Sequence, residues 1–229
     1  MTLHLYFHPL SSYCHKALIA LYERDVAFTP ELVDLGDAAS RARFVALWPL
    51  AKMPVLRDEA RGCTIAESTV VIDYLDAFYP GAPLTPSEPD AAWRTRLWDR
   101  FFDNYLQTPM QKIVGDGFRP EGCGDTFGVA QAIADIGRAY DILDRELGAN
   151  TWAIGETFTL ADCAAVPALI YADAVAPLPA HARNVASYLD RLLARPSVAR
   201  TLREAEPYFP SFPLDRKPRI QPRRASSVS

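Results

Sequence analysis

Two short groups of polar residues stand where side-chain hydroxyls and free backbone N–H groups could bind an anion. Ser11 and Ser12 open the run Ser-Ser-Tyr-Cys-His-Lys, and Glu67 and Ser68 precede an apolar helical pattern. At the start of a helix, unpaired N–H groups and the helix dipole attract negative charge, so both positions suit an anionic ligand. The same residues are also ordinary helix N-caps, and each pair taken alone favours that structural interpretation.

Histidines and cysteines add few candidates. His8 and His15 could act as general bases, but the sequence identifies no partner for either, and we assign them no role. Cys14 is expected to be a buried apolar residue. The remaining cysteines, Cys63, Cys123 and Cys163, are too widely spread for a Cys-x-x-Cys pair or a zinc knuckle. We therefore expect free thiols in a reducing cytoplasm, with neither a disulfide nor a bound metal.

Composition favours a soluble enzyme that acts on small molecules. The chain has 229 residues, 49% of them apolar, which is enough to bury a core without covalent cross-links. The formal net charge is only −4, and the basic residues are scattered except in the tail, so we expect no nucleic-acid partner. The first residues carry no basic leader, and no long uncharged apolar run occurs, so we expect neither secretion nor a membrane partner.

The first 80 residues predict an α/β domain of order βαβαββα. Leu3, Leu5 and Phe7 alternate with polar residues, as in a strand that ends at Pro9. A helical pattern then runs from Ser11 to about Glu23. The remaining elements predicted here are strands at 26–33, 54–57 and 63–65, a helix at 41–48, and a helix that Pro80 ends.

A proline-rich segment separates this domain from a helical one. Residues 80–89 hold four prolines in ten residues, a composition that continues neither periodicity. We place the first domain at 1–80, a linker at 81–89, an all-α domain at 90–207 and a C-terminal extension at 208–229.

The second domain shows two long apolar stripes and one clear helix start. The stripes predict two long antiparallel helices that pack against each other along these apolar faces. The first stripe consists of Trp93, Leu97, Trp98, Phe101, Phe102 and Tyr105, and the second of Val129, Ile133, Ile136, Tyr140, Leu143 and Leu147. Thr159 and Asp162 have the spacing of an N-cap and its acidic partner, which indicates a buried helix after Thr159.

Four motifs together resemble the cytosolic glutathione transferases of the bacterial, serine-type kind, whose first domain is thioredoxin-like. They are Ser-Ser-Tyr-Cys-His-Lys at 11–16, Ala-Lys-Met-Pro at 51–54, Glu-Ser at 67–68 and Thr-Leu-Ala-Asp at 159–162. The first motif also resembles the Cys-Pro-Tyr-Cys site of glutaredoxins with serine in place of the first cysteine. Ala51 and Lys52 depart from the Gly or Gln of many members, and Cys163 replaces a larger aliphatic residue.

The resemblance implies a role for each matching residue. A serine hydroxyl would stabilise the thiolate of glutathione; Ser11 matches serine-type members, and Ser12 matches the position used by cysteine-type bacterial members. A cis Met53–Pro54 bond would let the Met53 backbone pair with the cysteinyl part of glutathione. Ser68 would bind the γ-glutamyl carboxylate, Glu67 the amino group, and Lys52 the glycine carboxylate. Glutathione is thus expected as the co-substrate.

The resemblance also implies a second pocket, for an apolar electrophile, between the domains. Candidate lining residues are Leu10, Tyr13, Tyr105, Met110 and Ile113, although a core position is the stronger interpretation of Tyr105. Conjugation, dehalogenation and ether cleavage would all begin with attack by the bound thiolate. A catalytically silent scaffold of the same fold is an alternative. A thiol-disulfide oxidoreductase is another, but it would need a cysteine at position 11 or 12.

Two features of the chain remain open at this stage. The tail carries Tyr208, Phe209 and Phe212 and then a basic stretch; it either lies on the surface or covers part of the active site. A homodimer is expected mainly because the family is usually dimeric. The Trp93, Trp98 and Phe101–Phe102 aromatics are compatible with a dimer face and equally with a thick core.

Overall fold

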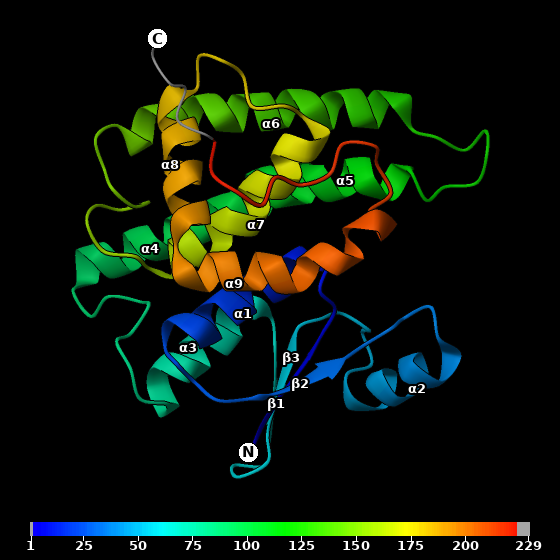
Figure 1. The fold of residues 1–229 in the computed structure, drawn as a ribbon, viewed down its shortest axis with the longest axis vertical. Coiled ribbons are helices and arrows are strands. Elements are labelled where there is room, and N and C mark those ends of the chain that lie inside the picture. Colours follow the sequence, from blue (N-terminus) through cyan, green and yellow to red (C-terminus); the bar gives the residue numbers. More distant parts are fainter. Residues whose placement is uncertain (1, 224–229) are drawn as a thin grey trace.

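A four-stranded mixed sheet forms the base of the first domain. The computed structural model describes residues 2–223. The strand order is β2-β1-β3-β4, with β1 parallel to β2 and antiparallel to β3, and β3 antiparallel to β4. Three helices accompany the sheet (Figure 1). The elements in chain order are β1 (Leu3–Phe7), α1 (Ser12–Glu23), β2 (Thr29–Leu32), α2 (Ala38–Leu47), β3 (Val55–Asp58), β4 (Cys63–Ala66) and α3 (Ser68–Phe78). The predicted order βαβαββα is confirmed.

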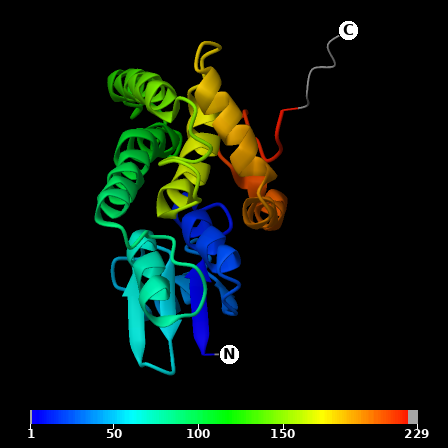
Figure 2. The ribbon, with the colours of Figure 1, turned by 90° about the vertical axis from the view of Figure 1, so that its left-hand side faces the viewer.

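The second domain is entirely helical and lies beside α1 and α3, on the side of the sheet away from α2 (Figures 1 and 2). Its elements are α4 (Pro89–Phe101), a π-helical turn η1 (Phe102–Gln107), α5 (Thr108–Asp116), α6 (Thr126–Leu147), α7 (Leu160–Val175), α8 (Arg183–Ala194), α9 (Pro196–Ala205) and a 3₁₀ segment η2 (Glu206–Ser211). The predicted helical class is confirmed.

The helix α1 is buried on two sides and joins the domains. Leu18 and Leu21 pack on the sheet with Leu5 and Leu56. Ile19 and Ala20 on the opposite side belong to the core of the second domain. Helix α7 is buried along almost its whole length and packs directly on α1. The surface of α7 is nearly all apolar, as this central position requires, whereas α1 also buries His15 and Lys16.

The start of α7 has the predicted capping arrangement. The Asp162 carboxylate accepts the Thr159 backbone N–H at 2.8 Å and the Thr159 hydroxyl at 3.1 Å. The same buried carboxylate accepts the Ala153 N–H at 2.9 Å and the Tyr188 hydroxyl at 2.6 Å. Asp162 therefore also ties the preceding loop and α8 to this helix start.

Several predicted bounds and faces were wrong. The second strand covers Thr29–Leu32 rather than 26–33, and the following helix begins at Ala38, three residues before position 41. The stripe predicted from Trp93 to Tyr105 is not one buried face: Trp98 and Phe102 are buried, whereas Trp93, Leu97 and Tyr105 are exposed. The π-helical turn accounts only for Tyr105, because its extra residue moves the core-facing position from 105 to Leu106; Trp93 and Leu97 lie on α4, before the turn.

The C-terminal segment follows the surface of the second domain and is anchored to it (Figure 1). Phe209 and Phe212 are buried in the core. Arg216 pairs with Asp173 on α7 at 2.9 Å, and Arg219 pairs with Asp190 on α8 at 2.5 Å. Among residues 2–223, no helix is both long and apolar enough to span a bilayer.

A buried arginine holds the linker against the end of α3. Arg24 donates to the Asp76 carboxylate at 2.7 Å, and to the carbonyls of Leu75, Tyr79 and Ala82 at 3.0, 2.7 and 2.6 Å. These carbonyls end α3 and begin the connection to the second domain, where the helix itself supplies no donors.

We expect Arg24→Ala to lower the free energy of unfolding by about 2–3 kcal/mol, because it removes the cation paired with Asp76 and one donor from each of three carbonyls. Arg24→Lys should lose nearly as much, since an ammonium group cannot reach all four acceptors. Urea denaturation of the three proteins tests this. If Arg24→Lys has the same free energy of unfolding as the unmodified protein, a positive charge at this position is sufficient and the hydrogen bonds to the carbonyls are not required.

Candidate active site

The strand register brings three predicted site segments to one end of the sheet. Tyr6 near the end of β1 pairs with Val55 at the start of β3, and Val55 pairs with Ala66 at the end of β4. The loop after β1, the loop before β3 and the turn after β4 therefore emerge together. Ser11, Pro54 and Ser68 stand on these three segments.

The two serines stand at the start of α1 in different surroundings. Ser11 is the N-cap, with extended backbone, and its carbonyl accepts the N–H groups of Cys14 and His15 at 3.0 and 3.1 Å. Its hydroxyl caps no backbone N–H of α1 among the described residues, and its side chain is half-buried. Ser12 is the first helical residue and is buried, at 6% exposure.

The neighbours of these serines are protonated and unreactive at neutral pH. Burial raises the pKa of the Cys14 thiol to about 12, and the hydrogen bond from Ser11 only partly offsets this. Burial, together with the Asp103 carboxylate, raises the pKa of Tyr13 to about 12. Cys14 is fully buried, as expected, and all four cysteines, which lie in the described part of the chain, are free. Neither Cys14 nor Tyr13 offers an anionic nucleophile or base.

The segment before β3 has the geometry that the resemblance implied. The Met53–Pro54 peptide bond is cis. Met53 is half-buried and Pro54 is buried, whereas Lys52 is exposed. Ala51 has a positive φ of 51°. The backbone of Met53, directly before β3, is placed where an extended peptide could pair with it as an added strand.

The turn after β4 places a carboxylate and a hydroxyl at the start of α3. Glu67, the N-cap, has a φ of 70° and an exposed side chain. This left-handed conformation is uncommon for a residue with a side chain, and such strain is concentrated at functional sites. Ser68, the first residue of α3, is 5% exposed. The first N–H groups of α3 therefore lie beside a serine hydroxyl, as in a carboxylate-binding site.

A buried charge network connects the helices behind these segments. Lys16 on α1 is fully buried and pairs with Asp99 on α4 at 2.5 Å and with Asp103 on η1 at 2.9 Å. It also donates to the Thr69 hydroxyl on α3 at 2.8 Å. Arg100, half-exposed, contacts the same two carboxylates at 2.7 and 2.5 Å. Two cations thus balance two carboxylates at the point where α1, α3 and α4 meet. Thr69, which belongs to this network, directly follows Ser68 in the sequence.

A pocket of about 250 Å³ opens beside the two serines, between the domains. One wall is the loop and helix start at Leu10–Ser12; α5 and α7 provide the middle; and the C-terminal segment closes the far side. The lining residues are Leu10, Ser11, Ser12, Met110, Gln111, Val114, Phe118, Tyr171, Ser211, Phe212 and Pro213. Apart from the serines and Gln111, the lining is mostly apolar or aromatic.

Comparison with protein families decides the identity. Residues 5–83 match the family model for the glutathione S-transferase N-terminal domain, and residues 118–195 match the one for the C-terminal domain. The chain belongs to the glutathione S-transferase family. It is accordingly a glutathione transferase.

Individual relatives cover nearly the whole chain. A stringent starvation protein A homolog of Coxiella burnetii is 29% identical over 88% of this chain and 92% of its own length. A glutathione S-transferase of Methylobacillus flagellatus with glutathione bound superposes with a TM-score of 0.80 at 26% identity, covering 87% of this chain and 98% of that one. One from Methylobacterium radiotolerans, in complex with glutathione sulfonate, gives a TM-score of 0.77 at 28% identity, covering 87% and 93%.

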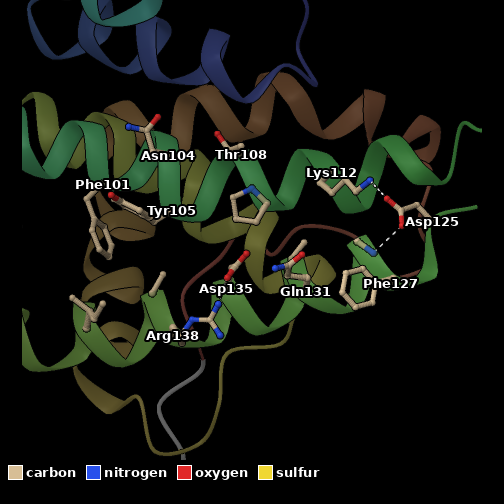
Figure 3. Close-up of a pocket in the computed structure, with 15 residues that line it drawn as sticks. Phe101, Asn104, Tyr105, Thr108, Lys112, Asp125, Phe127, Gln131, Asp135 and Arg138 are labelled. Carbon is tan, nitrogen blue, oxygen red and sulfur yellow. Dashed lines mark hydrogen bonds and ion pairs between the residues drawn. The ribbon is translucent and has the colours of Figure 1, made fainter.

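Only part of the predicted electrophile pocket of this transferase lines the pocket observed. Leu10 and Met110 do, but Tyr13, Tyr105 and Ile113 are not among its lining residues. Tyr105 is 59% exposed and lies on a separate groove of about 1010 Å³ between the η1–α5 segment and α6 (Figure 3). The Tyr105 side chain is therefore neither in the core nor in the pocket beside the serines, the two locations considered from the sequence.

Several lining residues of this interdomain pocket were not predicted from the sequence. Val114 and Phe118 follow Met110 at steps of four along α5 and its end, so the helical period could have indicated them. Phe212 was considered only as part of a tail that could cover the site. Its position in the wall supports that alternative. Tyr171, inside an alanine-rich buried helix, carries no local signal.

Proposed function

We propose that glutathione binds along the sheet end that joins Ser11, Pro54 and Ser68. The convergence of these residues beside an interdomain pocket is the observation that carries the proposal. The Met53 backbone would pair with the cysteinyl unit, and Lys52 would reach the glycine carboxylate. Ser68 and the first N–H groups of α3 would hold the γ-glutamyl carboxylate, with Glu67 near the amino group.

The serine hydroxyl would serve to keep glutathione ionised. A free thiol has a pKa of roughly 8.5, and lowering it by about two units requires about 2.7 kcal/mol. A hydrogen bond to a charged sulfur supplies ~1.5–3 kcal/mol, and the N-terminus of α1 adds ~0.3–1 kcal/mol. Together these two contributions are sufficient, so no further general base is needed.

Ser11 is our choice for this hydrogen bond. It is less buried than Ser12 and borders the pocket, and its hydroxyl, which contacts the Cys14 thiol, caps no backbone N–H of α1 among the described residues. Ser12 also borders the pocket, but a nearly buried hydroxyl is less accessible to a ligand sulfur.

The apolar and aromatic lining of the pocket supports an apolar electrophile as the second substrate. The bound thiolate would attack an electrophilic carbon, forming the C–S bond as the leaving group departs with its electron pair. The enzyme would contribute proximity and thiolate formation. Conjugation, dehalogenation and ether cleavage share this step.

The experiment that tests the site is a calorimetric titration with glutathione, combined with thiolate absorbance measured against pH. We expect binding in the micromolar to millimolar range and a bound-thiol pKa about two units below that of free glutathione. Binding with an unshifted thiol pKa would instead favour a catalytically silent scaffold, an alternative supported by the Coxiella relative named as a stringent starvation protein A homolog. Absence of binding would contradict the proposed site.

We also propose a cytoplasmic homodimer. A dimer is supported by large apolar side chains exposed on α3, α4, η1 and α6, namely Val70, Phe78, Trp93, Leu97, Tyr105 and Ile142. The cytoplasm is supported by four free cysteines. Sedimentation equilibrium checks the dimer, which a single species at the monomer mass would contradict.

A further inference from the structure

Two buried rings hold consecutive carbonyls of the loop that carries Ser11. His15 Nε2 on α1 lies 2.6 Å from the Pro9 carbonyl oxygen. The Tyr171 hydroxyl on α7 donates to the Leu10 carbonyl at 3.0 Å. Since a carbonyl can only accept, His15 must carry its proton on Nε2. Burial lowers the pKa of His15 to about 4, which keeps the ring neutral and in this donor form.

These two bonds come from outside the loop, one from each domain. Within the loop, the Ser11 N–H bonds to the His8 carbonyl at 2.9 Å, and the Leu10 N–H bonds to His8 Nδ1 at 3.1 Å. Those local bonds set the turn but do not fix its orientation relative to the pocket. The contact from Tyr171 does, because α7 belongs to the second domain and forms part of the pocket wall.

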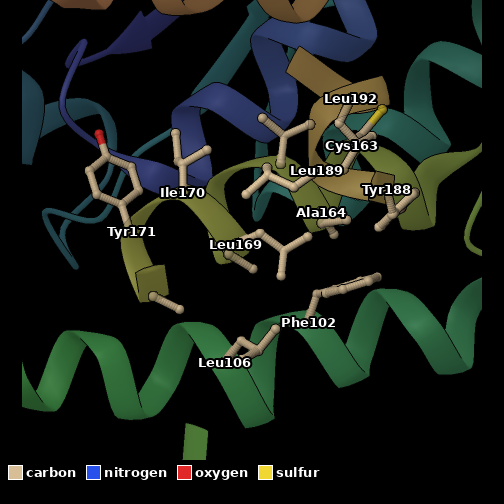
Figure 4. Packing of buried hydrophobic residues seen from close by; sticks show 14 of the residues in the cluster. Phe102, Leu106, Cys163, Ala164, Leu169, Ile170, Tyr171, Tyr188, Leu189 and Leu192 are labelled. Atoms are coloured by element: carbon tan, nitrogen blue, oxygen red, sulfur yellow. The ribbon is translucent and has the colours of Figure 1, made fainter. Parts of the chain in front are cut away.

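The rings also form a continuous row. His15 and Tyr171 have ring centroids 5.7 Å apart, and Tyr171 and Phe212 have centroids 5.6 Å apart. Figure 4 shows the Tyr171 hydroxyl directed away from the helical core, toward the N-terminal segment drawn in blue. The row therefore connects α1, α7 and the C-terminal segment, and it ends at a side chain that lines the pocket.

We propose that Tyr171 and His15 are positioning residues that fix the Leu10 and Pro9 carbonyls and thereby aim the Ser11 hydroxyl at the sulfur of glutathione. This inference rests on the proposed role of Ser11. A hydrogen bond weakens steeply as its geometry departs from linear, so a small rotation of the loop costs part of the thiolate stabilisation. The glutathione anchors at Pro54 and Ser68 lie on other segments and are unaffected.

The test compares Tyr171→Phe with Tyr140→Phe. The first removes only the hydroxyl and keeps the ring between His15 and Phe212. The second is a matched control, because buried Tyr140 donates to the Ala176 carbonyl at 3.2 Å, away from the pocket. The measurements are the pKa of bound glutathione from thiolate absorbance, the Kd for glutathione, the Tm, and kcat/KM with an activated aryl chloride.

We expect Tyr171→Phe to raise the bound-thiol pKa by about 0.5–1 unit and to lower kcat/KM at pH 6.5 by about two- to fivefold, with the Kd changed less than about twofold. Tyr140→Phe should lower the Tm similarly and leave the thiol pKa unchanged. His15→Gln, which keeps an N–H donor, should retain more of the pKa shift than His15→Leu.

The outcomes separate this inference from the proposed function. If Tyr171→Phe changes only the Tm, as the control does, while Ser11→Ala raises the thiol pKa, Tyr171 is merely structural and the inference is wrong. If the unmodified protein leaves the thiol pKa at its free value, the proposed role of Ser11 fails, and the inference fails with it.

Discussion

Replacing Lys16 with methionine should lower the free energy of unfolding by about 3–5 kcal/mol, because the change removes the buried cation that pairs with two buried carboxylates. The Lys16 ammonium is fully buried, Asp99 is 1% exposed and Asp103 is 9% exposed. Arg100 alone would then face both carboxylates, and its own side chain is half-exposed, so solvent screens its attraction. Chemical denaturation followed by far-UV circular dichroism measures the loss.

A surface pair joining the same two domains provides the control. Arg96 on α4 and Asp73 on α3 lie 3.6 Å apart, with about half of the arginine side chain exposed. Arg96→Met should cost less than about 1 kcal/mol. Adding Asp99→Asn to Lys16→Met should restore part of the stability, because one fewer buried charge then lacks a partner. If Lys16→Met and Arg96→Met lower the free energy of unfolding by the same small amount, burial of the Lys16 pair does not increase its contribution to stability.

The network has a consequence for the site as well as for folding. Thr69, which accepts a hydrogen bond from Lys16, follows Ser68 at the start of α3, and Lys16 itself lies in the second turn of α1. The charges thus connect the starts of α1 and α3, both in the first domain, to α4 and η1 of the second domain. Loss of the Tyr171 hydroxyl should change mainly the thiol pKa. Loss of the charge network should instead weaken glutathione binding itself, because it displaces Ser68.

Short-range patterns were enough to predict the order of elements but not this interface. Alternation at Leu3, Leu5 and Phe7 and the capping pair Thr159–Asp162 depend only on near neighbours, and both correspond to the elements observed. Lys16 shows the limit, because a lysine beside His15 resembles a solvent-facing helix position. Its carboxylate partner Asp103 is 87 residues away in the sequence. A pairing over that distance has no local periodicity.

The same limit applies to the pocket. Ser11, Pro54 and Ser68 could be proposed because each stands at a strand or helix end with a recognisable motif, and the cis bond at Pro54 agrees with that motif. Tyr105 was misplaced because a π-helical turn shifts the helical phase, which apolar spacing alone does not indicate. Phe212 and Tyr171 meet only through tertiary packing.

Replacing Ser11 with alanine should raise the pKa of bound glutathione by about 1–2 units, since it removes a hydrogen bond to sulfur worth ~1.5–3 kcal/mol. At pH 6.5 we expect kcat/KM to fall by about 5- to 50-fold, because the thiolate drops from about half of the bound glutathione to a minor species. The loss should shrink as the pH rises and nearly vanish above the pKa of free glutathione, where the thiol ionises without assistance. Thiolate absorbance and the pH–rate profile measure both effects.

Ser12→Ala is the matched comparison, since the two serines are adjacent and both border the pocket. We expect less than about a threefold loss of kcat/KM and a thiol pKa close to that of the unmodified protein. A glutathione Kd that changes little in both variants would place the effect on ionisation rather than on binding. If Ser12→Ala instead raises the thiol pKa and Ser11→Ala does not, the sulfur lies against the first residue of α1, and the hydroxyl assignment must be exchanged.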